Sequence, residues 1–140
     1  MKVRDVMTKG VVTARPEDTI QAVARQMSEI DTGVIPVAEN GRVVGLITDR
    51  DIVLRIVAES GDVQAPVSSV MTTGVETVDA GESLKVAAKK MSQLQIRRLV
   101  VLGEGGELAG ILSLGDVALE DDDRAEDILE AVSDPGDRPA

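Results

Sequence analysis

The stretch Gly45-Leu46-Ile47-Thr48-Asp49-Arg50-Asp51-Ile52 returns near the end of the chain as Gly110-Ile111-Leu112-Ser113-Leu114-Gly115-Asp116-Val117. Each copy begins with glycine, continues as a short apolar strand to a hydroxyl residue, and reaches an aspartate three residues later, where a helical pattern begins. We therefore expect the hydroxyl residue to cap a helix in each copy. Asp51 and Asp116 then lie in the first helical turn, beside N–H groups that lack an intrahelical acceptor. Such a carboxylate is explained either by local capping or by contact with a ligand.

The similarity between the two copies extends to an internal duplication. An offset of 64 residues aligns Val3–Thr8 with Val67–Thr72, and one additional residue near Gly105 restores the alignment of the two glycines that begin the motif. The sequence thus predicts four segments, which are a first repeat at 1–60, a linker at 61–66, a second repeat at 67–122 and an acidic tail at 123–140.

Each repeat is predicted to fold as strand, helix, strand, strand, helix, which gives an α+β protein. Asn40-Gly41 is a strong signal for a tight hairpin with positive φ, and apolar residues at helical spacing place Met27 and Met91 in the core. A half of about 55 residues buries too little surface to be stable alone, so we expect the repeats to pack about a pseudo-twofold axis. The predicted elements of the first repeat are a strand at Gly10–Ala14, a helix capped by Asp18 or Thr19, strands at 34–38 and 42–48, and a helix at 49–58.

The composition excludes several classes of function. The 140 residues contain no Cys, no His and no aromatic residue. Disulfides, thiolate or imidazole metal sites, and Ser-His or Cys-His catalysis are therefore excluded. An enzyme is the least favoured class, because nothing accompanies the carboxylates for acid–base work. We expect no catalytic residues, no metal site and no required cofactor.

The charge distribution bears on partners and location. Residues 120–140 carry a net charge of −7 out of a total of −10, so nucleic acid is a poor partner, but a local basic pocket is possible in the remainder. Neither a membrane span nor a signal peptide is recognisable, so we expect a cytoplasmic protein without a membrane partner. The tail residues Ile128, Leu129 and Val132 fit a terminal helix, whereas the surrounding carboxylates fit a solvated tail or loose binding of a divalent cation.

The duplicated pattern resembles the cystathionine-β-synthase (CBS) domain, and residues 1–119 resemble a stand-alone CBS pair, or Bateman module. The resemblance rests on Asp5-Val6-Met7-Thr8, Ile35-Pro36-Val37 and the closing Gly-x-x-Thr/Ser-x-x-Asp, which recur in order except that Leu99-Val100-Val101 replaces the second motif. It implies a regulatory module that binds AMP, ADP, ATP or S-adenosylmethionine in clefts between the repeats. It also implies a homodimer formed through helices, and an unidentified partner protein that is regulated. A ligand-free structural or dimerisation module is the alternative.

By this resemblance, the hydroxyl residue and the aspartate of each closing motif contact the ribose. These pairs are Thr48 with Asp51 and Ser113 with Asp116. An ionised carboxylate only accepts hydrogen bonds and can take them from both hydroxyls of a ribose. The base is expected beside the first strand of each repeat, around Thr13, Ala14, Thr77 and Val78, where the alternative role of these residues is structural.

The phosphates of a nucleotide need separate cationic partners. Arg97 and Arg98 match the position of phosphate-contacting basic residues in the family, with a solvated edge as the alternative explanation, and Arg50 is a further candidate. The corresponding residues of the first repeat, Gly33-Val34, carry no charge. This difference predicts that one cleft binds phosphate better, and that the other is weak, empty or suited to an uncharged adenosyl group.

Overall fold

The computed structural model describes residues 1–120. These residues form two compact units, and each unit combines most of one sequence repeat with the first segment of the other repeat. Unit 1 comprises Met1–Gly10 together with the chain from Glu76 onward, and unit 2 comprises Val11–Val75. The two segments that the duplication makes equivalent, Val3–Thr8 and Val67–Thr72, therefore each complete the unit built on the other repeat. The repeat boundaries and the pseudo-twofold packing stay predictions, and the tail at 123–140, with its apolar stripe, lies outside the described residues.

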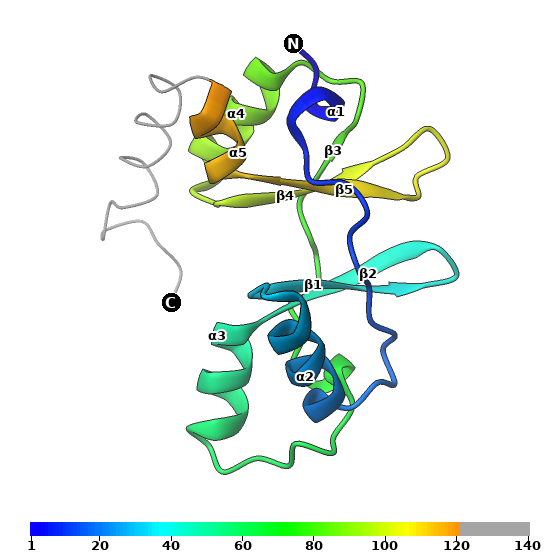
Figure 1. The fold of residues 1–140 in the computed structure, drawn as a ribbon, viewed down its shortest axis with the longest axis vertical. Coiled ribbons are helices and arrows are strands. Elements are labelled where there is room, and N and C mark those ends of the chain that lie inside the picture. The colour runs from blue at the N-terminus through cyan, green and yellow to red at the C-terminus, as the bar shows by residue number, and fades with distance from the viewer. Residues whose placement is uncertain (121–140) are drawn as a thin grey trace. The chain divides into compact units, whose positions relative to one another are not determined.

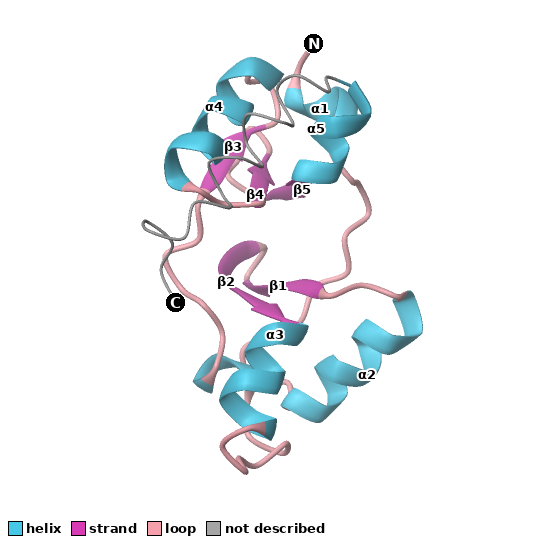
Figure 2. Cartoon of the chain, turned by 90° about the vertical axis from the view of Figure 1, so that its left-hand side faces the viewer, coloured by secondary structure: helices cyan, strands magenta, loops and turns pink. Residues whose placement is uncertain are grey.

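Unit 2 is built on a two-stranded antiparallel sheet. Asn40 and Gly41 join the strands with φ of 54° and 79°, which confirms the predicted hairpin. Helices α2 and α3 lie on one side of this sheet (Figures 1 and 2). Its elements are α2 (Ile20–Ile30), β1 (Val34–Glu39), β2 (Arg42–Thr48), α3 (Asp49–Ile52), a π-helical turn η1 (Val53–Val57) and a short 3₁₀ turn η2 (Val67–Ser69).

Two predicted elements of this unit differ from the structure. The strand at Gly10–Ala14 is reduced to a single parallel bridge between Ala14 and Val37, in which the Ala14 N–H donates to Pro36 at 2.9 Å and the Ala14 carbonyl accepts from Ala38 at 2.8 Å. The helix predicted at 49–58 begins at Asp49 as α3 but continues as a π-helical turn. The cap of α2 is Thr19, whose hydroxyl accepts from the Ala22 N–H.

Unit 1 is built on a three-stranded sheet in the order β3-β4-β5, with β3 parallel to β4 and β4 antiparallel to β5. Helices α1, α4 and α5 lie on one side of this sheet (Figure 2). Its elements are α1 (Val3–Val6), β3 (Thr77–Asp79), α4 (Leu84–Leu94), β4 (Arg98–Leu102), β5 (Leu108–Ser113) and α5 (Leu114–Glu120). The predicted α+β class is confirmed. No helix within residues 1–120 is both long and apolar enough to cross a bilayer.

Each unit has its own aliphatic core, and one of the two exchanged segments contributes to each core. Val3 is fully buried among residues of α4, β4 and β5 in unit 1. Its counterpart Val67 is fully buried among residues of α2, β1 and β2 in unit 2. Met27 and Met91 lie in the two cores, as predicted. The exchange is therefore held by packing as well as by hydrogen bonds.

The glycine that begins each closing motif allows an exchanged segment to lie directly against a strand. A Cβ on Gly110 would be 2.5 Å from the Thr8 carbonyl oxygen and 2.9 Å from Met7 Sδ. At this point Thr8 and Ile111 exchange backbone hydrogen bonds of 2.9 and 3.1 Å. Gly45 meets Met71 and Thr72 in the same way in unit 2. The motif requires glycine because another backbone approaches closely.

Gly110→Ala is expected to destabilise unit 1 by about 1–3 kcal/mol, since the methyl group displaces the Thr8 backbone. Chemical denaturation followed by circular dichroism measures the loss. Gly115→Ala is the matched control, because its Cβ would be 3.6 Å from Ser113 Oγ and alanine favours the helix. Equal stability of Gly110→Ala and the parent chain would contradict this account of the motif.

Candidate functional site

Both closing motifs form reciprocal capping boxes with nearly identical geometry. In unit 2 the Thr48 hydroxyl accepts from the Asp51 N–H at 3.1 Å, and Asp51 Oδ2 accepts from the Thr48 N–H at 2.9 Å. In unit 1 Ser113 and Asp116 form the same pair of bonds, again at 3.1 and 2.9 Å. Each box uses Oδ2 of the aspartate and directs the side chain to a fixed place at the start of a helix. The predicted caps are confirmed.

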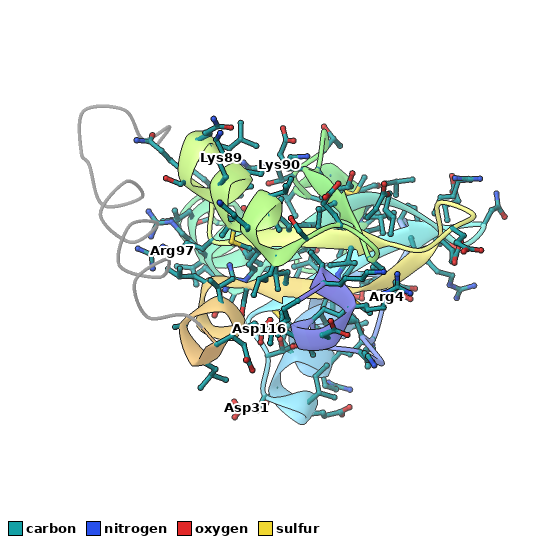
Figure 3. All side chains as sticks on the ribbon, turned by 90° about the horizontal axis from the view of Figure 1, so that it is seen from above. Arg4, Asp31, Lys89, Lys90, Arg97 and Asp116 are labelled. Atoms are coloured by element: carbon teal, nitrogen blue, oxygen red, sulfur yellow. The ribbon has the colours of Figure 1, made fainter. Side chains whose placement is uncertain are left out.

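In unit 1 the backbone brings the predicted cations next to this box. Arg98 is the register partner of Ser113 across β4 and β5, and the Arg97 carbonyl accepts from the Leu114 N–H at 2.8 Å. Both arginines are exposed. Neither guanidinium forms an ion pair or hydrogen bond within residues 1–120. Figure 3 labels Arg97 and Asp116 in this unit.

The strand predicted to hold the base in unit 1 is β3, which lies beside β4. Thr77 pairs with Val100, and the Val78 side chain points into the core at 8% exposure. Lys90 of α4 reaches the start of this strand, where its Nζ donates to the Thr77 carbonyl and lies 3.7 Å from Glu76 Oε2. Beside the buried Val78, β3 thus presents its backbone, the half-buried Thr77 side chain and the exposed Asp79 side chain outside the core.

The corresponding part of unit 2 has the opposite charge. The Gly33 carbonyl accepts from the Asp49 N–H at 2.9 Å, as Arg97 does from Leu114 in unit 1. A Cβ on Gly33 would be 2.8 Å from Asp49 Oδ2, so the Asp49 carboxylate lies over the position where unit 1 carries arginine. A phosphate group would meet this carboxylate instead of a cation.

The Asp51 carboxylate of unit 2 also has a cationic neighbour that its counterpart lacks within residues 1–120. Arg55 Nε lies 3.9 Å from Asp51 Oδ1, and Arg55 Nη1 donates to the Val70 carbonyl at 2.9 Å. The residue at the equivalent position of the second repeat is Glu120. Asp116 Oδ1 therefore has no cationic partner within the described part of the chain.

The remaining predicted residues of unit 2 have different degrees of exposure. Thr13 is exposed, and Ala14 is buried at 2% exposure against β1. Arg50 is exposed on α3, and its side chain forms no ion pair or hydrogen bond within residues 1–120. The structure thus gives unit 2 the same capping box, with Arg55 as the cation beside its aspartate.

Sequence reasoning did not identify Asp49, Arg55 or Lys90. Asp49 was visible in the repeat alignment, where it occupies the place of Leu114. Arg55 likewise stands where the second repeat has Glu120. The contact of Lys90 with Thr77 carries no sequence signal, because it depends on the packing of α4 against β3.

The CBS domain model matches residues 3–58 and 67–123, and the chain belongs to the CBS domain family as a tandem pair. It is 44% identical over 117 residues to the CBS domain-containing protein YhcV of Bacillus subtilis, and the alignment covers 84% of this chain and 83% of that protein.

Two solved CBS pairs with adenosine-containing ligands have the same fold. A CBS domain protein from Pyrobaculum aerophilum, complexed with AMP, superposes with a TM-score of 0.78 at 28% identity and covers 95% of this chain and 98% of its own. The CBS domain pair of protein MJ0100, solved with 5′-methylthioadenosine and S-adenosyl-L-methionine, gives a TM-score of 0.75 at 25% identity and covers 85% and 94%.

Proposed function

We propose that this chain is a regulatory CBS pair that binds an adenosine-containing nucleotide of the AMP, ADP or ATP class and signals its occupancy to a partner protein. One observation carries the proposal: two arginines that form no ion pair within residues 1–120 adjoin the capping box of unit 1. A nucleotide needs both an acceptor for its ribose hydroxyls and cations for its phosphate. The AMP complex of the Pyrobaculum relative supports the same ligand class.

In this proposal, different residues of unit 1 contact the ribose, the phosphate and the base of the ligand. Asp116 Oδ2 is held by the Ser113 N–H, so Oδ1 accepts from the ribose hydroxyls and the Ser113 hydroxyl adds an adaptable group. The Arg97-Arg98 pair supplies the cation for the phosphate, and one of the two faces it, because neighbouring side chains alternate along an extended segment. The base lies along β3 near Thr77, against backbone and aliphatic groups, since the chain has no aromatic residue for stacking.

Unit 2 is proposed to discriminate against phosphate. Asp49 lies over Gly33, and Arg55 neighbours Asp51, so an approaching phosphate meets a carboxylate and the ribose acceptor is already partly neutralised. We expect this half to be empty, or to take an uncharged adenosyl group weakly. The nucleotide stoichiometry is then one per chain.

Equilibrium dialysis against AMP, ADP, ATP and S-adenosylmethionine tests the ligand class. Adenine absorbance reports binding directly, because the chain contains no Trp or Tyr. We expect saturable binding of at least one of the phosphorylated compounds. Failure of all four at millimolar concentration would contradict the nucleotide-sensing function and leave the ligand-free interaction module.

Dimerisation through helices is proposed under either function. The helical face of unit 2 exposes Val53, Leu54 and Val57 at 53, 48 and 64%. Such a patch of aliphatic side chains on adjacent turns favours burial against another surface, and the occupant proposed is a second copy of the chain.

Val57→Asp is expected to convert the dimer into a monomer, because a charge in an apolar interface is desolvated without a partner. Sedimentation velocity measures the change. Val12→Asp, at a position of 38% exposure outside the helices, serves as the control and is expected to leave the mass unchanged. A monomeric parent chain, or a dimeric Val57→Asp variant, would contradict the proposed interface.

A further inference from the structure

A pocket of about 420 Å³ opens in unit 1 at the carboxyl ends of two parallel strands. It is lined by Arg4 of α1, by residues 79–81 at the end of β3 and by residues 102–104 at the end of β4. The strands pair at Asp79 and Leu102, and beyond this point the chain diverges to α4 and to the β4–β5 hairpin. Crevices outside the carboxyl ends of parallel strands are common ligand sites, and roughly 300–1,000 Å³ is typical of a small-molecule pocket.

The pocket contains charges of both signs that do not neutralise one another. Arg4 contributes a guanidinium, and Asp79 and Glu104 contribute carboxylates. None of these three side chains forms an ion pair or a hydrogen bond within residues 1–120. Ala80 and Leu102 add apolar surface. The pocket is separate from the Arg97 and Asp116 region, since Figure 3 places Arg4 on the opposite side of Asp116 from Arg97.

Two glycines make room for charged side chains beside this pocket. A Cβ on Gly81 would be 3.0 Å from Arg4 Nη2, and a Cβ on Gly103 would overlap the Glu107 carboxylate. Neither glycine has a positive φ, so backbone conformation does not require glycine at these positions. Their small size instead allows the Arg4 guanidinium and the Glu107 carboxylate to lie close to the backbone.

In the equivalent region of unit 2, the arginine lies beside carboxylates of its own unit. The Ser68 N–H donates to the Pro16 carbonyl at 3.1 Å, just as the Arg4 N–H donates to Ala80 at 3.0 Å. Serine thus replaces Arg4, and Arg15, which replaces Asp79, lies 3.6 Å from Glu17 and 3.7 Å from Asp18. Only unit 1 retains unpaired charges of both signs at this place among the described residues.

We propose that the pocket binds the zwitterionic head of a free aliphatic α-amino acid. Its carboxylate accepts hydrogen bonds from the Arg4 guanidinium, which suits a planar two-oxygen partner. Its ammonium donates to Asp79 and Glu104, and its side chain lies on Ala80 and Leu102. Because Arg4 belongs to the exchanged segment, the ligand joins α1 to the sheet of unit 1. The site does not depend on the adenosyl proposal.

Titration of the ¹⁵N-labelled full chain with L-leucine tests the site. Saturable chemical-shift changes are expected at the amides of Arg4, Gly81 and Gly103. Leucinamide lacks the carboxylate and N-acetyl-leucine lacks the ammonium, so each is expected to bind at least about tenfold more weakly. No saturable change with L-leucine up to about 20 mM, or binding of either blocked compound as tight as that of L-leucine, would overturn the proposal.

Variants test whether L-leucine binds in this pocket or elsewhere on the chain. Arg4→Ala is expected to weaken L-leucine binding at least about tenfold, and Gly81→Ala to weaken it by displacing the guanidinium. Arg15→Ala in the equivalent region of unit 2 is the matched control and is expected to have no effect. Binding that persists in both Arg4→Ala and Gly81→Ala would overturn the assignment. AMP binding, measured on the same samples, reports separately on the proposed nucleotide site.

Discussion

Asp116→Asn is expected to weaken the binding of AMP and of adenosine alike, by about ten- to a hundredfold. The substitution removes a charged acceptor from the ribose hydroxyls, and a hydrogen bond to a charged group contributes about 1.5–3 kcal/mol. Combined Arg97→Ala and Arg98→Ala is expected to weaken AMP by a similar factor and to leave adenosine unchanged, since only the phosphate contacts arginine. Isothermal titration of each variant with both ligands measures the four affinities.

The controls for this comparison come from the same chain. Asp51→Asn makes the equivalent change in unit 2 and is expected to leave AMP affinity unchanged. Lys89→Ala removes an exposed positive charge from α4 of unit 1, and so accounts for nonspecific attraction. Because Asp116 also caps α5 through Ser113, the thermal stability of Asp116→Asn is measured beside its affinity. Unchanged AMP binding in a folded Asp116→Asn variant would contradict the ribose assignment.

Val3→Asp is expected to destabilise unit 1 by at least about 3 kcal/mol, because it places a carboxylate without a partner in an apolar core. Val3 is fully buried with residues of α4, β4 and β5, which belong to the second repeat, although Val3 lies at the start of the first repeat in sequence. Amide hydrogen exchange is the measurement, and β3, β4 and β5 are expected to lose protection.

Val67→Asp is the reciprocal variant, since Val67 is fully buried in the core of unit 2. It is expected to affect β1 and β2 first. Val12→Asp, at a partly exposed position, is expected to change neither pattern. Loss of protection in β1 and β2 on Val3→Asp, with β3 to β5 unaffected, would contradict the exchange of segments.

Local patterns in the sequence were sufficient to predict much of the structure of each repeat. The Asn40-Gly41 hairpin, the capping boxes at Thr48 and Ser113, and the buried Met27 and Met91 all depend on turn chemistry or on helical periodicity. These signals lie within a few residues of the structure that they specify, and the structure confirms them.

The features that sequence reasoning missed depend on long-range packing. The alignment of Val3–Thr8 with Val67–Thr72 showed that the segments are equivalent, but it did not show which repeat each one completes. The strand predicted at Gly10–Ala14 has the right composition, yet only Ala14 reaches a strand partner. The pocket beside Arg4 arises from the same exchange and was therefore not foreseen.

The candidate site was predicted in part. Resemblance identified Arg97, Arg98, Ser113 and Asp116, and the register of β4 and β5 explains why the residues on these strands are neighbours. The uncharged Gly33 was also noted as a difference between the repeats. The position of the Asp49 carboxylate over Gly33 was not predicted, because a glycine in the sequence does not reveal which side chain occupies the space beside it.

Isothermal titration of the full chain with AMP and with adenosine, at low and at high salt, tests the central proposal most directly. We predict one AMP per chain, bound more tightly than adenosine at low salt, with the difference decreasing as salt screens the phosphate contacts. Two equivalent AMP sites, equal affinities for AMP and adenosine at low salt, or no binding of either ligand would contradict it.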